Sequence, residues 1–414
     1  MNYIIYFLLF LYSIVSMLPF MGSTDKAGNQ WLFLSILNLI SLSVFFISKQ
    51  SFKFFTSPLF KVILAFFILC IVSISFSNNV ILSLHDISRQ ATFFVSYLFI
   101  SAFLFSKNLN IKLNVVFAFF VFSLIIESYY SLQPIIYDLI FNSKNIFDYS
   151  SININALIGL TGNRNITTAA IAIKLPFLYF FIIKSNNYLR TILLSSLIFI
   201  CALPIFLISS RAALLSFSLL NIVLILFLLF KSNESFRYFK SVLIILFTLC
   251  SYIISVLILP SSTANGVDRL QSIALTNESS SNRLTLWSNA IDYITNNPII
   301  GAGIGNWKIE SAYYWGSLGE NYLVPFHAHN DFLEYTTELG ILGGILYFLI
   351  FLISFVLILK FFNSHLNTSI LLLMVLGVYF IDSFFNFPFE RPIMQVPFIF
   401  LLAVITSKFN FSND

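Results

Sequence analysis

Long runs of apolar residues alternate along this chain with shorter polar stretches. Most runs have ~17–25 residues, the length at which an α-helix crosses the hydrocarbon core of a bilayer. They lack the regular alternation of apolar and polar residues that a transmembrane β-strand shows. We therefore expect an all-α polytopic membrane protein in which residues 1–414 form a single membrane domain. About twelve membrane-spanning helices are predicted, over residues 3–20, 31–48, 58–76, 90–106, 113–132, 166–183, 190–208, 212–230, 241–259, 332–360, 367–385 and 392–407.

Two polar segments between these runs are longer than the others, residues 133–164 and residues 260–330. The second is far too polar to lie in a membrane core. Within it, residues 281–298 (SNRLTLWSNAIDYITNNP) carry apolar side chains at helical spacing, which predicts an amphipathic helix lying on the membrane surface. The apolar positions are Leu284, Trp287, Ile291 and Ile294. The glycine-rich run GAGIGNW at 301–307 is expected to form a tight turn, because no strand precedes it and no Lys-Ser/Thr pair follows.

Lysine placement predicts the orientation of the chain in the membrane. The lysines fall in alternate loops, which the positive-inside rule assigns to the cytoplasm. Both termini are then cytoplasmic, and segments 133–164 and 260–330 face the periplasm or cell exterior. The lysines in question are Lys49, Lys53, Lys107, Lys112, Lys184, Lys231, Lys240, Lys360 and Lys408.

Arginines follow the opposite distribution and gather at the outer face or its membrane boundary. Topology does not require outward arginines, whereas guanidinium groups bind phosphate through paired donors and stay charged when partly desolvated. This enrichment favours an outer-face site for a phosphate-bearing ligand. The alternative is that these side chains reach lipid headgroups or pair with nearby acids. The outer arginines are Arg89, Arg164, Arg211, Arg269, Arg283 and Arg391.

The stretch PFHAHNDFLEYTTELG at 325–340 concentrates polar residues where the long loop meets the tenth predicted helix. Asn330 is suited to cap that helix, with Asp331 and Glu334 in its first turn, where carboxylates complement the helix dipole. Glu334 and Glu338 are four residues apart and share a face that enters the membrane, so at least one should meet an arginine or a histidine. His327 and His329 are candidates to accept a proton near neutral pH at the membrane boundary.

Further polar residues are expected to join this site from other helices. Arg211 stands where the seventh helix gives way to the eighth. Arg164 and Asn165 begin the sixth helix, with Lys174 about two turns further in. Lys174 is a candidate for substrate binding, and pairing with Glu127 of the fifth helix is its structural alternative. Three charged residues mark the outer end of the eleventh helix: Asp382, Glu390 and Arg391.

Composition agrees with a membrane protein and adds little further chemistry. The chain is 58% hydrophobic and only 9% charged, with a mean hydropathy of +0.91, well outside the range of soluble globular domains. The three cysteines lie far apart inside apolar runs and are expected to pack in the core. No Asp-x-Asp pair or histidine cluster calls for a divalent metal, so we expect no metal, no cofactor and no nucleic-acid partner.

HAHNDFLEYTTELGILGG, preceded by RLTLWSNAIDYITNNPIIGAGIGNW and by SSRAALLS, resembles the O-antigen ligase superfamily, whose members share the Wzy-C domain. The resemblance is clearest over residues 160–345, the expected catalytic region. It implies a glycosyltransferase type C-like fold with a large periplasmic loop between helices nine and ten. It also implies glycan transfer from an undecaprenyl-diphosphate carrier to an acceptor hydroxyl at the periplasmic face of the inner membrane, by a metal-independent inverting mechanism.

The family's motifs map onto particular residues of this chain. Its His-Asn motif falls on His329 and Asn330, its Ser-Arg motif on Ser210 and Arg211, and its loop arginine on Arg283. We therefore expect His329, Arg211 and Arg283 to be catalytic, with His329 the favoured base although His327 is also present. The remaining candidates are expected to bind substrate: Arg164, Asn165, Lys174, Arg89, His327, Asn330, Glu334, Glu338 and Arg391.

Three acceptors are compatible with the superfamily. Lipid A-core defines the O-antigen ligase, a growing glycan the O-antigen polymerase, and a protein Ser/Thr the O-oligosaccharyltransferase. We favour the ligase, with membrane lipids as the remaining partners. The alternative from another class is a transporter or flippase of an anionic lipid-linked substrate. That class predicts internal repeats and charges spread to both faces, whereas the polar residues here gather on one face.

Overall fold

The computed structural model describes residues 1–18, 25, 27–48, 53–106, 109, 111–141, 156–230, 236–258, 283–315 and 326–411. Arg269 lies outside these residues, as do parts of the two polar segments 133–164 and 260–330. The described residues are helical and contain no strand, as the apolar runs predict. Each of the twelve predicted spans corresponds to one helix: α1 (Asn2–Ser13), α2 (Gly28–Ile47), α3 (Pro58–Ser73), α4 (Val80–Phe105), α5 (Leu113–Phe141), α6 (Arg164–Ile183), α7 (Tyr188–Ile208), α8 (Arg211–Phe230), α9 (Arg237–Ile258), α13 (Asp331–Lys360), α14 (Leu366–Phe385) and α15 (Pro392–Phe411).

Ten of the helices in the described part of the chain are long and apolar enough to cross a membrane, fewer than the twelve expected. The two shorter apolar helices are the first and the last, Asn2–Ser13 and Pro392–Ser407. The predicted span 3–20 is too long, because the chain leaves the α-helix at Ser13 and continues as a 3₁₀ turn over Val15–Met17. The protein is therefore a multi-pass membrane protein by length and composition of its helices.

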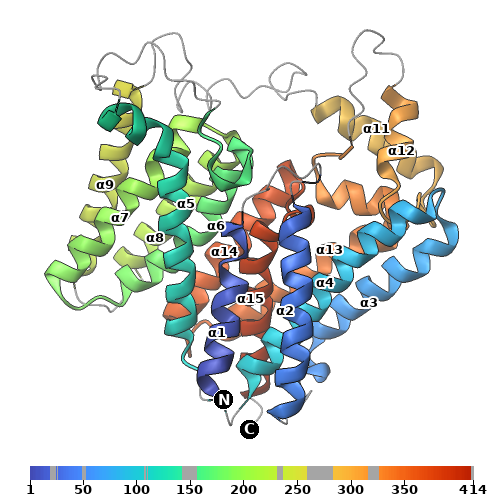
Figure 1. The fold of residues 1–414 in the computed structure, drawn as a ribbon, viewed down its shortest axis with the longest axis horizontal. Coiled ribbons are helices and arrows are strands. Elements are labelled where there is room, and N and C mark those ends of the chain that lie inside the picture. The colour runs from blue at the N-terminus through green and yellow to red at the C-terminus, as the bar shows by residue number, and fades with distance from the viewer. Residues whose placement is uncertain are drawn as a thin grey trace.

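Helix α6 lies at the centre of the bundle, packed against α5, α7, α8 and α14. Of its apolar window, 89% is buried inside the protein, the highest share among the candidate spans. Helix α1 begins and α15 ends at the same end of the bundle, and the helices of the long polar segment, α11 (Arg283–Asn296) and α12 (Trp307–Trp315), lie at the other end (Figure 1). We call these the terminal end and the loop end.

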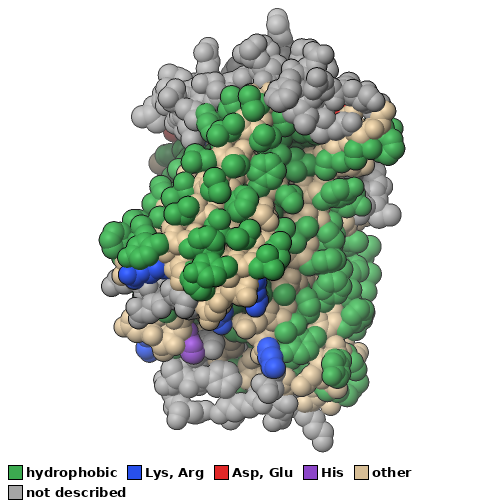
Figure 2. Space-filling model, turned by 90° about the vertical axis from the view of Figure 1, so that its left-hand side faces the viewer, with side chains coloured by type: hydrophobic (Ala, Val, Ile, Leu, Met, Phe, Trp, Pro, Cys, Tyr) green, Lys and Arg blue, Asp and Glu red, His purple; other side chains and the backbone are tan. Residues whose placement is uncertain are grey.

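The surface has the character of a membrane protein. Apolar side chains cover a broad belt of one face, and the Lys and Arg side chains visible there gather below it, toward the terminal end (Figure 2). Asparagine defines the start of four helices: Asn79, Asn163, Asn187 and Asn330 each accept a hydrogen bond from a backbone N–H in the first turn of α4, α6, α7 and α13. These caps satisfy N–H groups that a helix start leaves without partners.

Helix α13 is bent at Gly340, whose φ of 70° lies in the left-handed region. The bend brings the turn after α11 against the helix, and Ile341 N–H donates to the carbonyl of Pro298 at 2.9 Å. A Cβ at position 340 would lie 2.2 Å from the carbonyl oxygen of Ile299, so only glycine fits here. Gly340 thus fixes the loop-end helices to the membrane bundle.

Helix α11 forms where the amphipathic pattern predicts it, but a different stripe packs inward. Leu286, Ala290 and Tyr293 are buried, the last two in a small core with Ala302, Trp307 and Ala328. The predicted stripe of Leu284, Trp287, Ile291 and Ile294 remains partly exposed, with Ile291 49% exposed. Trp287 packs edge-on against Phe384 at 5.6 Å between ring centroids. Contact of this outer stripe with the membrane surface stays a prediction.

Candidate functional site

Both histidines of the 325–340 stretch lie against one aromatic ring at the loop end of the bundle. The His327 ring stacks on Phe387 at 4.0 Å between centroids, and the His329 ring meets it edge-on at 5.0 Å. The guanidinium carbon of Arg391 lies 4.0 Å from the centroid of the same ring. Phe387 follows the end of α14 and precedes the 3₁₀ turn Pro388–Glu390. We call the residues 386–391 the Phe387 corner.

The start of α13 holds the histidines in place. His329 has a φ of 52°, a left-handed conformation that is costly for a residue with a side chain. It turns the chain into the helix, where Asn330 Oδ1 accepts a hydrogen bond from Leu333 N–H at 3.1 Å. The predicted cap is therefore confirmed. Asp331 ties the helix to the Phe387 corner, accepting from Phe389 N–H at 3.3 Å and from the Tyr347 hydroxyl at 3.0 Å.

His327 is paired with a carboxylate. Its Nδ1 lies 2.8 Å from Oε1 of Glu334, whose Oε2 accepts from the backbone N–H of Ala328 at 2.9 Å. Burial alone lowers the pKa of His327, but the charge of Glu334 and its hydrogen bond outweigh burial and raise the pKa above its usual value. The expectation that one of the two helix carboxylates meets a histidine is confirmed.

His329 has the opposite environment. Its Nδ1 is buried and makes no hydrogen bond to any residue that the structure describes. Burial is the largest cause that lowers its pKa, followed by the positive charges of Arg283, His327 and Arg391, and together they bring the pKa to about 3. The His329 imidazole is consequently neutral throughout the physiological range.

We call Arg211, Arg283 and Arg391 the cationic cluster, and the charges of Arg283 and Arg391 act on His329. Burial lowers the pKa of Arg283, Asp382 opposes this, and the charges of Arg211 and Arg391 lower it further. The charges of the other two arginines thus reach Arg283. Arg391 is itself buried, with 8% of its surface exposed.

Among the described residues, Asp382 is the carboxylate that Arg283 and Arg391 have in common. Arg283 Nη2 donates to Asn386 Oδ1 at 3.1 Å, and Asn386 Nδ2 donates to Asp382 Oδ1 at 2.6 Å. Arg391 Nη1 is 4.0 Å from the other oxygen of Asp382, at the limit of an ion pair. Arg391 Nε and Asp382 Oδ2 are buried without a hydrogen bond to any described residue. Asp382 thus meets Arg283 through Asn386 and meets Arg391 only at the limit of an ion pair.

Arg211 enters this cluster through a break between two helices. α7 ends at Ser209, whose φ is 55°, and α8 begins at Arg211, as the sequence predicts. Arg164 and Asn165 form the first turn of α6, behind the Asn163 cap. Because α7 returns the chain from α6 to α8, both helices begin at the same end of the bundle. Arg164 and Asn165 therefore face the same side of the membrane as Arg211.

The structure separates other predicted site residues from this cluster. Lys174 is fully buried in the bundle, where its Nζ pairs with Glu127 and donates to Ser16 Oγ at 2.8 Å. Lys174 thus forms the structural pair with Glu127 that was the alternative to substrate binding. Arg89 bridges Glu390 and Asp25, with 2.7 Å between its Nη2 and the Asp25 carboxylate. Arg89 is beside the Phe387 corner, but its charge is already matched.

Glu338 meets the glycine-rich turn and not an arginine. Its Oε1 accepts from Trp307 N–H at 3.2 Å, and Gly305 N–H donates to the same carboxylate. The predicted tight turn is confirmed, because Gly301, Gly303 and Gly305 all have positive φ. The backbone N–H groups that a phosphate would need are therefore already used, two by the Glu338 carboxylate and those of Ala302 and Gly303 by backbone carbonyls of α13.

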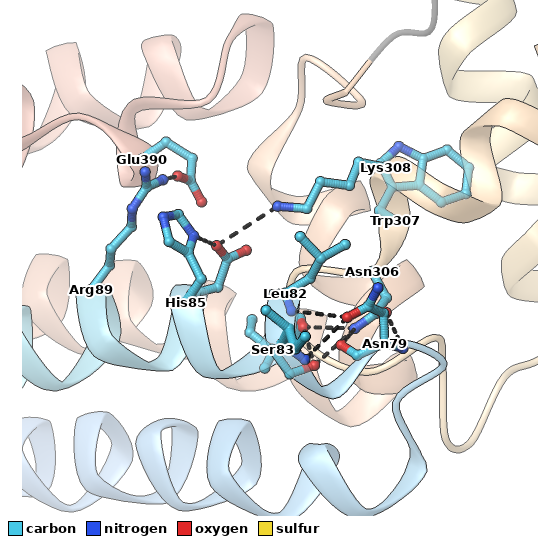
Figure 3. A network of polar contacts seen from close by, with 12 residues as sticks. Asn79, Leu82, Ser83, His85, Arg89, Asn306, Trp307, Lys308 and Glu390 are labelled. Atoms are coloured by element: carbon cyan, nitrogen blue, oxygen red, sulfur yellow. Dashed lines mark hydrogen bonds and ion pairs between the residues drawn. The ribbon is translucent and has the colours of Figure 1, made fainter. Parts of the chain in front are cut away.

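A second polar network, absent from the sequence predictions, fastens α4 to α12. His85 Nδ1 lies 2.9 Å from Asp86 Oδ1, and Lys308 Nζ lies 3.9 Å from the same oxygen (Figure 3). Asn306 Nδ2 donates to Ser83 Oγ at 2.8 Å.

Phe387 was also absent from the sequence predictions, since the 382–392 segment was considered for its charges alone. Its sequence signal is an aromatic residue between Asn386 and Pro388, three residues before the charged pair Glu390-Arg391.

An apolar groove of about 530 Å³ lies between α8, α13 and α14. Its walls include Leu220 of α8, Phe348 of α13 and Gly377 of α14. The groove extends along α14 to Ile381, the residue before Asp382. In the described residues, no three His, Cys, Asp or Glu side chains are grouped so as to hold a metal ion.

Residues 196–348 match a family model described as O-Antigen ligase, with the Wzy_C domain. This match supports placing the chain in the O-antigen ligase superfamily. No curated protein matches the chain. The matched region contains Arg211, Arg283 and both histidines of the site and ends within α13. The superfamily carries out glycan transfer of the ligase or polymerase type. The Phe387 corner and Arg391 lie beyond the matched region, and only the fold brings them to the site.

Proposed function

We propose that this superfamily member transfers a glycan from an undecaprenyl-diphosphate carrier to an acceptor hydroxyl at the periplasmic face of the inner membrane. The proposed acceptor is lipid A-core, which makes the reaction O-antigen ligation. The observation that carries the proposal is the cationic cluster, in which Arg283 and Arg391 are loosely paired with Asp382 beside a neutral imidazole. Such a site attracts negative charge, and a diphosphate supplies it.

The chemistry that the cluster supports is departure of an anionic leaving group. As the glycosidic bond to the carrier breaks, negative charge grows on the diphosphate. Arg211, Arg283 and Arg391 stabilise that charge from fixed positions in a partly buried site, where electrostatic stabilisation is stronger than in water. Three guanidinium groups fill the role that a divalent metal has in other phosphate chemistry, and the mechanism is metal-independent. Direct attack of the acceptor on the anomeric carbon inverts its configuration.

The apolar groove supports a lipid-linked donor. An isoprenoid chain has no polar groups that need hydrogen-bond partners. Its free energy falls when it leaves water and packs against an apolar surface. The groove between α8, α13 and α14 reaches Ile381, one residue before Asp382 on α14. A carrier whose tail lies in this groove presents its diphosphate to Arg211 and Arg283 and its glycan to His329.

The acceptor approaches from the loop end. His329 binds the reacting hydroxyl or the adjacent phosphate as a neutral hydrogen-bonding group. Arg164 and Asn165, at the start of α6, bind the polar part of the acceptor. Asn330 and Glu338 act through the backbone, by capping α13 and by holding the glycine-rich turn.

The distribution of charge supports this orientation. Lys and Arg side chains gather at the terminal end on the face shown in Figure 2. The positive-inside rule assigns that end to the cytoplasm. The loop end, with the cationic cluster, then lies in the periplasm.

Glycan analysis of a deletion strain tests the acceptor. A ligase predicts lipid A-core without polymer, while polymer accumulates on the carrier. Single-repeat glycans on lipid A-core would identify a polymerase instead, and loss of glycan from a protein would identify an O-oligosaccharyltransferase.

A further inference from the structure

The two histidines at the Phe387 ring differ in the one property that decides whether an imidazole can take a proton. His327 has an acidic partner, Glu334, while His329 faces three cations or potential cations, Arg283, Arg391 and His327. A positive charge formed on His329 would be repelled, and one formed on His327 would be neutralised. The sequence favours His329 as the base, whereas the surrounding charges favour protonation of His327.

We infer that His327, oriented by Glu334, accepts the proton of the acceptor hydroxyl, and that His329 acts as a neutral binding group. The inference rests on the proposed glycan transfer. It makes His327 the catalytic base and Glu334 a positioning residue.

The geometry of His327 fits a base. Nδ1 is held by Glu334 Oε1 at 2.8 Å, which leaves Nε2 as the nitrogen that meets the acceptor. Glu334 is itself fixed by the Ala328 N–H at 2.9 Å, and the imidazole plane is fixed by stacking on Phe387. A carboxylate that orients an imidazole, whose other nitrogen serves the reacting hydroxyl, is the arrangement that hydrolases use to activate a nucleophile. The His327 side chain is 26% exposed, so an acceptor can reach it.

The reaction step balances without a further reactant. The acceptor oxygen forms a bond to the anomeric carbon of the glycan while the bond from that carbon to the carrier phosphate breaks. The electron pair of the broken bond leaves with the diphosphate, next to the cationic cluster. The hydroxyl proton moves to Nε2 of His327, and the imidazolium is neutralised by Glu334 until water removes the proton.

The charged groups that act on His327 come from two elements. Glu334 belongs to α13, and Glu390 and Arg391 belong to the Phe387 corner. Glu390 reinforces Glu334 and Arg391 opposes it, while burial also opposes protonation. The net direction is a raised pKa, so wild-type activity should fall as pH drops through a value above the usual histidine pKa of about 6.5.

The test is the pH dependence of transfer by the purified full-length protein, using a lipid-diphosphate-linked glycan and its acceptor. Glu334→Gln removes the charge and keeps an oxygen for the Ala328 N–H. It should move the acid limb about one pH unit or more downward, the usual size of a charge-partner effect. The maximal rate should fall about tenfold or more, because the weakened base accepts the proton less readily.

Two further variants separate this role from a structural one. His327→Gln should lower the rate ~10²–10⁴-fold and remove the acid limb altogether. His329→Gln should slow transfer but leave the acid limb where the wild type has it. Glu310→Gln is the matched control, because Glu310 is a loop-end carboxylate that binds Asn78, away from both histidines. It should change neither rate nor limb.

The outcomes are distinct. If wild-type protein transfers no glycan, the proposed function fails. If it transfers glycan and the acid limb stays in place in Glu334→Gln, or disappears in His329→Gln and not in His327→Gln, the proposed function survives and His327 is not the base. Should Glu334→Gln not fold, the His327→Gln and His329→Gln profiles decide the question.

Discussion

Arg89 and the cationic cluster, two arginine sites at the loop end, differ in how closely carboxylates pair with them. Arg89 lies between two carboxylates, Asp25 and Glu390, which more than neutralise it. Arg283 meets Asp382 only through Asn386, and Arg391 lies 4.0 Å from the same carboxylate. The sequence presents all of these as outward arginines of one kind. The structure pairs Arg89 directly with two carboxylates and leaves Arg283 and Arg391 with a more distant one in common.

This difference indicates where a ligand belongs. A buried cation costs free energy unless an opposite charge accompanies it, and the protein provides that charge for Arg89. Arg283 and Arg391 are paired less closely with the described carboxylates, which favours this position for an anionic ligand. Lys174 follows the pattern of Arg89, since it is fully buried with Glu127 as its partner. The predictions below test this division, beginning with the largest expected effect.

Removing a member of the cationic cluster should abolish transfer. Arg211→Ala and Arg283→Ala should each lower the rate at least 10²–10³-fold, the usual loss for one preorganised group that stabilises developing charge. His329→Ala should abolish transfer as well, because it removes the neutral group between donor and acceptor. The measurement is product formation per folded molecule, with folding checked by size-exclusion chromatography in detergent.

Arg89→Met is the matched control for that series. It removes a loop-end arginine of the same chemistry that already has its partners. The thermal midpoint should fall, because Glu390 and Asp25 lose their shared cation, while transfer by the folded fraction stays near the wild-type rate. A loss of transfer as deep as that of Arg283→Ala would erase the distinction between the two sites.

Breaking the Lys174 pair should reduce stability and not chemistry. Lys174→Met leaves Glu127 buried without its cation and should cost about 3–5 kcal/mol of folding free energy. The double variant with Glu127→Gln should recover most of that loss, because no uncompensated charge remains. Denaturation of the purified protein measures both changes. Normal stability in Lys174→Met, together with weak donor binding, would return Lys174 to the substrate site.

Filling the groove should weaken use of the donor. A Cβ at Gly377 would meet no heavy atom within 4 Å, so a larger side chain enters the open groove without a clash. Gly377→Phe should raise the KM for a long-chain lipid-linked donor about tenfold, a change worth about 1.4 kcal/mol of binding. A short-chain donor should be affected less. Gly377→Ala is the control, and equal effects of Phe on both donors would exclude the groove as the path of the tail.

Chelation should have the smallest effect. Because arginines neutralise the leaving diphosphate, transfer should continue at the same rate in EDTA. Strong inhibition that added Mg²⁺ or Mn²⁺ reverses would show that a metal shares this task with the cationic cluster.

The helices could be predicted because their signal is local. An apolar run of sufficient length forms a helix in a membrane whatever surrounds it, and an asparagine before the run caps it. Arg211 and Asn330 were placed correctly for this reason: both stand at a helix start visible in the sequence. The predicted span 3–20 was longer than its helix, since hydropathy does not show that α1 ends at Ser13.

The site depends on contacts between distant residues, and these the sequence does not reveal. The Phe387 ring meets His327 and His329 across about sixty residues of chain, through the packing of α14 and α15 on α13. Helix packing likewise makes Glu127 the partner of Lys174, a contact that the sequence left open. Pattern reasoning identified the right residue types, and only the fold assigned their partners.

The most direct test of the central claim is transfer in proteoliposomes that hold a lipid-diphosphate-linked glycan and an acceptor on the side of the loop end. Wild-type protein should form the glycosylated acceptor and free carrier diphosphate in equal amounts, Arg283→Ala should form almost none, and Arg89→Met should match the wild type. Movement of the donor across the bilayer without any transfer to the acceptor would contradict the account and identify a flippase.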